Sequence, residues 1–380
     1  MRKGVKDPLL VILVILLIIL LVLERPSFVT LTSLINWKTI LNLLAILLSV
    51  KGLELSGFLT YVASKIISST RSLRKLALVY VCTVFTLAPV VTNDISLLVM
   101  VPLLSSIACT LERDLSDLAV LSSVAANVGS SLTPIGNPQN LIIFHHYHIP
   151  FITFVLYMAV PVLVMFLLLI AFTYIMCKED TISLTITKIK SCKYNRKLAL
   201  TSIIMLAVII LILATPLRHV YCIAYILAAV SIIVFTLVDV RVLRYSDWNL
   251  LAIILLMFLD FGLISHMCTV EALIRKFMKS PIEIYFFSIG LSQIMSNVPA
   301  TVLLINLVNN YVPLMYGVNI GGNGTIIASL ANLIAYRTYF GPRTRNVIVR
   351  FHVVSIAYLA VSSIIVALLL YAHPFSLVYL

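Results

Sequence analysis

The 380-residue chain is dominated by apolar side chains: 62% are hydrophobic, only 11% are charged, and the mean hydropathy is +1.13. Because soluble domains carry about 25% charged residues, lipid must be the main solvent of this chain. The net charge of +13 does not indicate a nucleic-acid partner, since the Lys and Arg residues lie in short loops between apolar runs, as topology determinants do. The six cysteines are scattered without a CxxC pair, which supports neither a disulfide framework nor a metal cluster.

Long apolar runs predict nine membrane crossings. They cover residues 8–23, 36–53, 117–146, 150–177, 198–215, 219–238, 248–264, 314–336 and 346–371, and the crossings 117–146 and 314–336 are interrupted. The first run is predicted to be a retained helix, because Glu24-Arg25-Pro26 offers no small-residue cleavage site.

Two further apolar stretches, 76–111 and 283–309, are each broken near the middle by polar residues. We predict that both are re-entrant hairpins, because arms of about 10–16 residues fall short of or barely equal a full span. The alternative is that each stretch is a pair of complete crossings.

The distribution of positive charge predicts the orientation. With a cytoplasmic N-terminus, 20 of the 27 Lys and Arg residues lie on the inner side, as the positive-inside bias requires. The same count results if the hairpins are spanning pairs, so it does not distinguish these topologies. The expected location is the plasma membrane, with several crossings.

An internal repeat relates the two interrupted crossings. Asn127–Ile142 (NVGSSLTPIGNPQNLI) and Asn319–Ile334 (NIGGNGTIIASLANLI) share seven of sixteen residues at a constant offset of 192. Similar elements precede both windows, so the sequence predicts a first repeat over 8–177, a linker and connecting helix over 178–218, and a second repeat over 219–371. Four crossings plus one connector make an odd number, so the second copy must be inverted. The predicted fold is an all-α polytopic membrane protein with two inverted repeats, each containing a re-entrant hairpin and a broken helix.

The interrupted segments and hairpin tips supply the candidate binding residues. Glycine and proline leave backbone groups that hydrocarbon cannot satisfy, so such breaks persist only where they line a cavity or hold a ligand. The nearby hydroxyl and amide groups can coordinate Na⁺ or hydrogen-bond an anion, and packing between helices is the alternative use of such residues. The candidates are Thr92, Asn93, Asp94, Asn127, Gly129, Ser130, Thr133, Asn137, Asn140, Ser296, Asn297, Thr301, Asn319, Gly321, Asn323, Thr325 and Asn332.

Five of these residues are the candidate Na⁺ ligands: Asn93, Asp94, Asn127, Asn297 and Asn319. We expect the four asparagines to converge on one site, because each hairpin tip and each break should lie near the middle of the bilayer. No cofactor is expected beyond Na⁺ or H⁺ as coupling ion.

Acidic residues within apolar runs point to coupling. Asp94 lies in the middle of an apolar stretch, where an ionised carboxylate is costly, so it could carry a proton or coordinate a cation. Asp260 is similar but lies outside the repeated windows, and functional and structural roles are both open for it. Lys51 and Glu54, one turn apart, are expected to pair with each other.

Several motifs resemble those of the ion transporter superfamily, which holds arsenite permeases, sodium/proton antiporters, citrate transporters and divalent-anion/sodium symporters. They are TNDISLLVMVPL (Thr92–Leu103), GSSLTPIGNPQNLII (Gly129–Ile143) and SNVPATVLL (Ser296–Leu304), together with the paired Asn36-Trp37 and Asp247-Trp248. The symporters carry Ser-Asn-Thr at both tips, whereas this chain has Thr92-Asn93-Asp94 and Ser296-Asn297-Val298. The tips look more like those of the arsenite-permease and antiporter branch.

The resemblance implies elevator-type movement, usually in a homodimer, and an arsenite-permease relative would also take a peripheral ATPase as partner. The partners expected are the lipid bilayer and a small ionic substrate, without nucleic acid. The sequence therefore predicts a secondary transporter of a small anion, of the arsenite/oxyanion or carboxylate type, coupled to H⁺ or Na⁺. A sodium/proton antiporter, an ion channel and a membrane-embedded enzyme are the alternatives. No nucleotide-binding or catalytic motif favours the enzyme.

Overall fold

The computed structural model describes residues 8–67, 70, 72–177, 194–340 and 345–372, and every regular element within these ranges is a helix. The basic residues predicted for the inner side at positions 2, 3, 6, 71 and 343, and the linker segment 178–193, lie outside the described residues.

The first half of the chain forms nine helices within the described ranges. They are α1 (Pro8–Glu24), α2 (Phe28–Leu34), α3 (Trp37–Leu55), α4 (Phe58–Ile67), α5 (Leu73–Val91), α6 (Asn93–Leu111), α7 (Ser116–Ser130), α8 (Pro138–His146) and α9 (Phe151–Met176). The predicted runs agree with these bounds to within a few residues. The short helices α2 and α4 were not predicted, because neither is long enough to stand out as a span.

The second half begins with the connecting helix α10 (Arg196–Ala214). It continues through η2 (Pro216–His219), α11 (Tyr221–Asp239), α12 (Arg241–Tyr245), α13 (Trp248–Ser265), α14 (Cys268–Lys276), α15 (Pro281–Met295), α16 (Asn297–Ile305), α17 (Tyr311–Gly321), η3 (Ile326–Ala328), α18 (Leu330–Ala335), η4 (Tyr336–Phe340) and α19 (Arg345–Ala372). The interrupted crossing predicted over 314–336 therefore starts three residues earlier, at Tyr311.

Among the residues that the structure describes, seven helices are long and apolar enough to cross a membrane, or eight if the bent pair α2–α3 is one span. The expectation of short hairpin arms is wrong for the first hairpin, because α5 and α6 have 19 residues each. At 1.5 Å per residue such a helix extends about 28 Å, close to a full span. The arms of the second hairpin, α15 and α16, have 15 and 9 residues. Re-entrance remains a prediction.

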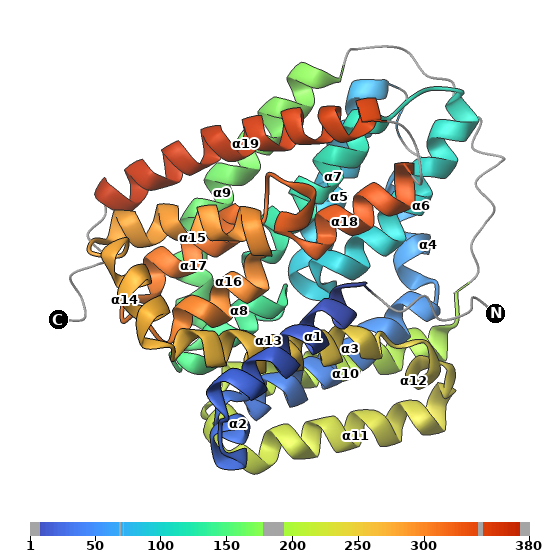
Figure 1. The fold of residues 1–380 in the computed structure, drawn as a ribbon. Coiled ribbons are helices and arrows are strands. Elements are labelled where there is room, and N and C mark those ends of the chain that lie inside the picture. Colours follow the sequence, from blue (N-terminus) through green and yellow to red (C-terminus); the bar gives the residue numbers. More distant parts are fainter. Residues whose placement is uncertain (1–7, 68–69, 71, 178–193, 341–344, 373–380) are drawn as a thin grey trace.

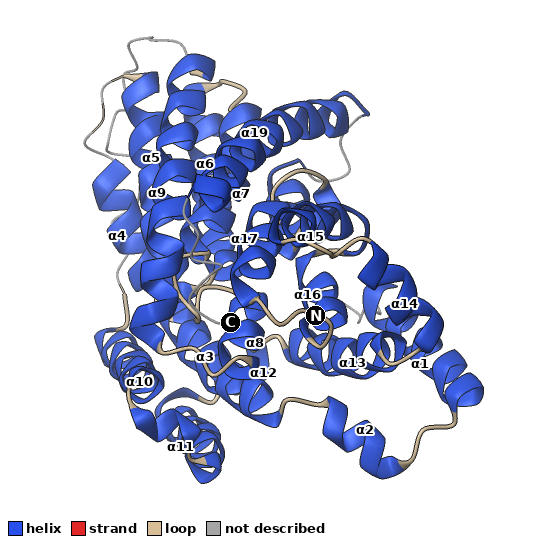
Figure 2. Ribbon diagram, turned by 90° about the vertical axis from the view of Figure 1, so that its left-hand side faces the viewer, coloured by secondary structure: helices blue, strands red, loops and turns tan. Residues whose placement is uncertain are grey.

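The helices are arranged in two layers (Figure 1). One layer, which we call the scaffold layer, contains α1, α2, α3, α10, α11, α12 and α13, which lie in the lower part of Figure 2. We call the other the hairpin layer; it contains α5–α9 and α15–α19. The layers meet where α3 packs on α6 and α8, and where α13 packs on α16.

Local sequence explains how the scaffold helices begin and pack. The side chains of Asn36 and Asp247 accept hydrogen bonds from the backbone N–H of Thr39 and Leu250, which caps the N-termini of α3 and α13. Gly52 lets α3 approach its neighbours closely, because a Cβ there would lie only 2.4 Å from Ser202 Oγ. The predicted pair of Lys51 and Glu54 is confirmed, with 2.9 Å between Nζ and Oε2.

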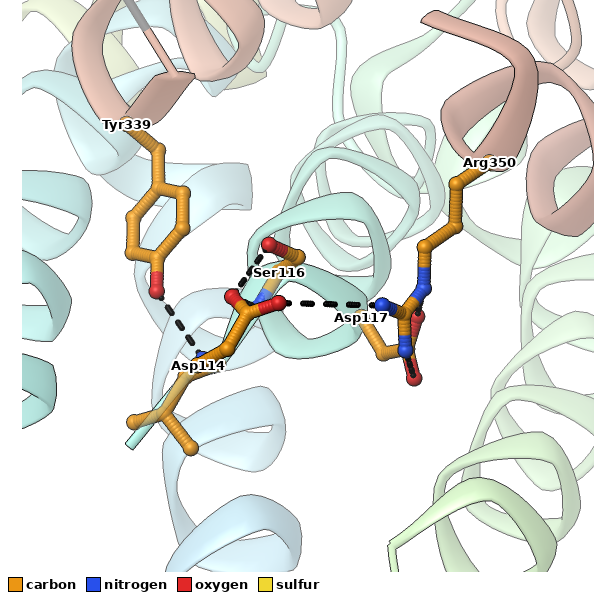
Figure 3. A network of polar contacts seen from close by, with 6 residues as sticks. Asp114, Ser116, Asp117, Tyr339 and Arg350 are labelled. Carbon is orange, nitrogen blue, oxygen red and sulfur yellow. Dashed lines mark hydrogen bonds and ion pairs between the residues drawn. The ribbon is translucent and has the colours of Figure 1, made fainter. Parts of the chain in front are cut away.

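At one end of the hairpin layer, α19 is tied to α7 (Figure 3). Arg350 Nε and Nη2 each lie 2.6 Å from a carboxylate oxygen of Asp117 in the first turn of α7, and Asp114 lies 3.7 Å from Nη1. The backbone N–H of Leu115 donates to the hydroxyl of Tyr339, at 3.0 Å. The two halves of the chain are therefore joined by a bidentate ion pair beside the start of the first broken helix.

Candidate functional site

The two hairpin tips share an unusual backbone conformation. Thr92, between α5 and α6, has φ 71° and ψ 156°, and Ser296, between α15 and α16, has φ 78° and ψ 156°. This region is almost restricted to glycine, so each residue costs about 1–3 kcal/mol of strain. Ser296 follows Thr92 by 204 residues. Because the same strained conformation occurs at both tips, we infer that it is a feature of the repeated hairpin and not of one turn alone.

Each broken helix is stabilised by one asparagine amide. Asn140 Nδ2 donates to the carbonyl oxygens of Ser130 and Thr133, at 3.3 and 3.0 Å. Its repeat equivalent Asn332 donates to the carbonyl oxygens of Gly322 and Thr325, both at 2.9 Å. Since carbonyls released at a break would otherwise be unpaired, these amides make both interruptions possible.

Hydrogen bonds between the two breaks are reciprocal. Asn127 Nδ2 donates to Asn332 Oδ1 at 2.9 Å, and its equivalent Asn319 Nδ2 donates to Asn140 Oδ1 at 2.7 Å. In this exchange each half donates one such hydrogen bond and accepts another, as expected if a two-fold axis relates the two halves.

The N-caps of α8 and α18 join the same network. Asn137 Nδ2 donates to Asn319 Oδ1 at 3.2 Å, and Ser329 Oγ donates to Asn127 Oδ1 at 3.0 Å. Ser329 follows Asn137 by 192 residues, the offset of the repeat. We call Asn127, Asn137, Asn140, Asn319, Ser329 and Asn332 the amide network.

The hairpin tips attach to this network. Asn93 Nδ2 lies 3.5 Å from Asn127 Oδ1, and Asn297 Nδ2 lies 3.0 Å from the position that a Cβ on Gly322 would take, with Asn127 Cγ 3.8 Å from that position. The structure therefore brings together Asn93, Asn127 and Asn297, and Asn319 joins through its carbonyl oxygen beside Gly322.

The breaks and the hairpins are also held by two threonines. Thr133 Oγ1 donates to the carbonyl oxygen of Pro89, and Thr325 Oγ1 donates to that of Gln293, at 2.6 and 3.1 Å. Gln293 follows Pro89 by 204 residues, so this contact is repeated in both halves. Thr133 and Thr325 thus anchor a hairpin arm rather than face a cavity.

The hydrogen-bonding capacity of the network is largely used. Both amide N–H groups of Asn127, Asn140, Asn319 and Asn332 are donated within the protein, and each amide oxygen accepts at least one hydrogen bond. An amide offers two donors and one acceptor oxygen, so these four have no N–H left for an anion. Their geometry favours a pivot that locks the two breaks together.

Unused hydrogen-bonding capacity remains at the first hairpin tip and in the second break. Asp94 Oδ1 is buried without a hydrogen-bond partner among the described residues, and the same holds for Asn323 Oδ1. Buried polar atoms are usually paired, so unpartnered ones are candidates for binding a cation, a proton or substrate. Within the described residues no group of three or more His, Cys, Asp or Glu could hold a metal, so a Na⁺ site here would use isolated carboxylate, amide and carbonyl oxygens.

A cavity of about 300 Å³ lies between the layers at the first tip. From the hairpin layer it is lined by Thr92, Asp94 and Asn137, with Ile95 and Leu98 of α6, Leu141 of α8 and Leu330 of α18 beside them. From the scaffold layer it is lined by Leu43, Leu47 and Lys51 of α3 and by Asp247 and Leu250 at the start of α13. Its wall is mainly apolar with a few polar groups, as small-molecule sites are.

The remaining predicted residues contribute locally. Ser130 Oγ donates to the carbonyl of Asn127 and receives a bond from Asn137, while Thr301 is fully buried and donates to Asn297 within its own helix. Ser296 donates to Asn297 Oδ1, at 3.4 Å.

Gly129 and Gly321, which occupy equivalent positions in the repeat, permit close packing. A Cβ on Gly129 would lie 2.2 Å from the carbonyl oxygen of Phe85, and one on Gly321 would lie 2.8 Å from Ser292 Cβ. Neither glycine lines the cavity.

Two residues in and around the site were not predicted. Gln293 bridges the second hairpin and the second break, since its amide donates to the carbonyl of Gly321 at 2.6 Å and accepts from the backbone N–H of Thr325 at 2.9 Å. Lys51 was predicted only as the partner of Glu54, and it also lines the cavity. Ser329 is one of the polar residues flanking the second break whose oxygens were expected to bind an ion or an anion, and the repeat alignment pairs it with Asn137.

Comparisons with known proteins extend over nearly the whole chain. A family model described as citrate transporter matches residues 3–316. The inner membrane protein YbiR of Escherichia coli is 31% identical over 341 residues, which cover 90% of this chain and 89% of that protein. The uncharacterized transporter MJ0456 of Methanocaldococcus jannaschii is 35% identical over 307 residues, or 80% and 81%. The silicon efflux transporter LSI3 of Oryza sativa is 44% identical over 79 residues, which are 20% of this chain and 16% of that protein.

Proposed function

This chain belongs to the citrate transporter family, and from that premise we propose that it is a secondary transporter of a small inorganic or organic anion coupled to H⁺ or Na⁺. It is a multi-pass membrane transporter and not an enzyme. The proposal also covers the position of the substrate site, the movement of the helices during transport and the identity of the coupling ion.

The observation that carries the proposal is the position of the cavity, between two layers that are otherwise packed together. A substrate bound there touches a strained hairpin tip on one side and the scaffold helix α3 on the other. A relative movement of the layers would therefore change the access to it without disturbing the interior of either layer.

The equivalent place in the second half is a direct packing contact between α13 and α16. Trp248 follows Trp37 by 211 residues, so Leu43 and Leu47 of α3 correspond to Ile254 and Phe258 of α13. All four residues are buried, but the first pair lines the cavity, whereas Ile254 and Phe258 lie on α13, which packs directly against α16. We propose that an elevator-type movement of the hairpin layer closes the cavity at α3 and opens one at α13, and that the reverse movement restores the first arrangement.

Helix N-termini at the cavity suit an anion. α6 begins at Asn93 and α8 at Pro138, and the backbone N–H of Asn93 donates to the carbonyl of Gly136, which holds the two starts together. The positive ends of their dipoles favour negative charge. The relatives named above are consistent with small oxygen-rich substrates, and the oxyanion and carboxylate types both fit a cavity of this size.

A sodium/proton antiporter is the second candidate, favoured by the charges on the cavity wall. Asp94 and Asp247 are carboxylates, and the cation Lys51 is already paired with Glu54. Such a wall attracts cations. The proposed ligands for Na⁺ are Asp94 and the neighbouring oxygens of Asn93, Asn127, Asn297 and Asn319.

The cytoplasmic N-terminus, the plasma membrane and a homodimer belong to the same proposal, as does a peripheral ATPase for a chain that works like an arsenite permease. The positive-inside distribution of Lys and Arg supports the orientation.

Uptake into proteoliposomes tests the function. Vesicles containing the protein are given a pH or Na⁺ gradient, and candidate arsenite, phosphate and carboxylate substrates are screened. Saturable anion uptake that depends on one gradient supports the first candidate. Na⁺ flux driven by a pH gradient without any anion identifies the antiporter, and flux without saturation or coupling would contradict both.

A further inference from the structure

Asp260 is a fully buried acid that the site described above does not use. It lies in α13 with 0% of its surface exposed, and neither carboxylate oxygen has a hydrogen-bond partner among the described residues. Buried carboxylates in folded proteins are normally paired or hydrogen-bonded. This exception lies on a helix that forms part of the boundary between the layers.

The surroundings of Asp260 are apolar. Ile253 and Met257 precede it on the same face of α13, at helical spacings of seven and three residues. They cluster with Leu13 of α1, and Val298 of α16 packs against this cluster. Val298 directly follows Asn297, so the face of α13 that carries Asp260 meets the start of the second hairpin's inner arm.

The charged groups on the neighbouring helices are paired with other residues, exposed, or of the same sign as a carboxylate. α2 and α16 carry none, and α1 carries Glu24 at its last position. On α14, Arg275 pairs with Glu271 at 2.8 Å, and Lys276 is exposed.

The remaining neighbour, α3, offers no partner either. Lys51 pairs with Glu54, and Lys38 donates to the carbonyl of His219 while lying over the ring of Tyr221. Among the described residues, therefore, no charge neutralises Asp260.

An ionised carboxylate in such a place carries a desolvation penalty of several kcal/mol with nothing to offset it. A protonated carboxyl avoids most of that penalty. We propose that Asp260 is a proton-binding site at the closed contact between α13 and α16, which holds one proton in this conformation and releases it when the contact opens to water.

The step is a simple protonation: the carboxylate takes one proton from water on the side where the contact is open and returns it on the other. The release of the proton depends on the proposed movement of the layers and so on the proposed function. The presence of a bound proton in this conformation does not depend on that movement. Asp260 is thus assigned to the coupling of H⁺, in a position separate from the cavity at Asp94.

Infrared spectroscopy of the purified protein in lipid vesicles at neutral pH tests the bound proton directly. Because Asp94 is also buried, the comparison is between Asp94→Asn and the double variant Asp94→Asn/Asp260→Asn. We expect the double variant to lose one protonated-carboxyl carbonyl band per chain, with an unchanged melting temperature. Asp239→Asn is the matched control, since Asp239 is paired with Arg241 and should contribute no such band.

Identical carbonyl bands in the two samples would overturn the proposal, because Asp260 would then be ionised. If Asp260→Asn does not fold, Asp260→Leu replaces it, as leucine matches the apolar neighbours and also removes the band. Release is tested by uptake: Asp260→Asn should abolish the dependence of transport on the pH gradient. A lost band with unchanged pH dependence of transport would overturn only the role of Asp260 in coupling. Absence of any transport in the unmodified protein would contradict the proposed function, but the infrared result on the bound proton would still hold.

Discussion

The two hairpins are built alike but meet the scaffold layer differently. Each has a strained residue at its tip, Thr92 or Ser296, and each is anchored by a threonine from the neighbouring break. The first faces α3 across a cavity of about 300 Å³, and the second lies in direct contact with α13. The asymmetry is therefore located at the boundary between the layers and not inside the hairpins.

This difference is the basis of the proposed exchange between two states. The amide network is reciprocal and uses nearly all of its hydrogen bonds, so it can remain intact while the contacts with the scaffold layer change. Packed interfaces tend to switch between discrete arrangements rather than deform continuously. The open and closed sides of this conformation would then exchange as the hairpin layer moves.

The largest effect is expected at the open side, from Asp94→Asn. The change keeps size and polarity but removes the carboxylate on the cavity wall, so transport should be abolished while the protein stays folded. Asp247→Asn is the matched control, because an asparagine still caps α13 and should retain much of the activity. Uptake and melting temperature are measured for both. Unchanged coupling-ion dependence in Asp94→Asn would remove Asp94 from the mechanism.

Labelling of single cysteines tests whether the two hairpins enter from opposite sides. The exposed positions Lys75 and Glu112 flank the first hairpin, and Lys279 and Asn309 flank the second. With re-entrant and inverted hairpins, a membrane-impermeant reagent reaches the first two from the cytoplasm only and the other two from outside only. Labelling of Lys75 and Glu112 from opposite sides would show that the stretch between them crosses the membrane an odd number of times. That result would contradict both a re-entrant hairpin and a spanning pair, and would remove the basis for the inverted count.

Substitutions in the amide network should lower stability, whereas a substitution at the second hairpin tip should weaken substrate binding. Asn127→Ala and Asn319→Ala each leave buried partners unpaired, at a cost of about 1–3 kcal/mol per group in unfolding free energy. Asn297→Ala should fold normally and raise the half-saturating substrate concentration about tenfold, which corresponds to one lost hydrogen bond of about 1.4 kcal/mol.

Thr301→Val is the control for these asparagine variants. The hydroxyl of Thr301 donates a hydrogen bond only within α16, so its loss should change neither the unfolding free energy nor the half-saturating concentration much. Denaturant unfolding in detergent and uptake kinetics provide the two readouts. Normal stability with weakened binding in Asn127→Ala would show that the network is the ligand site itself and not a pivot.

The smallest effect is expected at the ion pair that joins α19 to α7. Arg350 is half exposed, so Arg350→Ala should lower the unfolding free energy by only about 0–1 kcal/mol. Asp117→Asn should do the same, and the double variant should be no worse than either single one. Loss of transport in Arg350→Ala would instead mean that this contact takes part in the movement.

The sequence predicted the repeated breaks because glycine, proline and asparagine stand at equivalent positions in apolar runs. Asn127 and Asn319 were found in this way, and so were Asn140 and Asn332. Their bonding partners could not be predicted, because each amide reaches across to the other half. Within one half, the same pattern fits equally well with ligand binding and with helix packing.

The different contacts that the two hairpins make with the scaffold layer could not be predicted from the sequence either. Leu43 and Leu47 are as apolar as Ile254 and Phe258, and nothing in their pattern says which pair lines a cavity in a given state. The arms of the first hairpin were predicted too short, because the polar residues at the tip obscured two helices of 19 residues each. Gln293 was overlooked because it lies before the tip, outside the aligned windows.

The most direct test of the exchange between the two sides is reciprocal accessibility of two equivalent residues. Leu47→Cys and Phe258→Cys are made separately in a chain whose six native cysteines are replaced, and thiol labelling is followed under different substrate and ion gradients. The account predicts that any condition that slows labelling at position 47 speeds it at position 258, and the reverse. Rates that rise and fall together, or a position 258 that stays unreactive under every condition that supports transport, would contradict it.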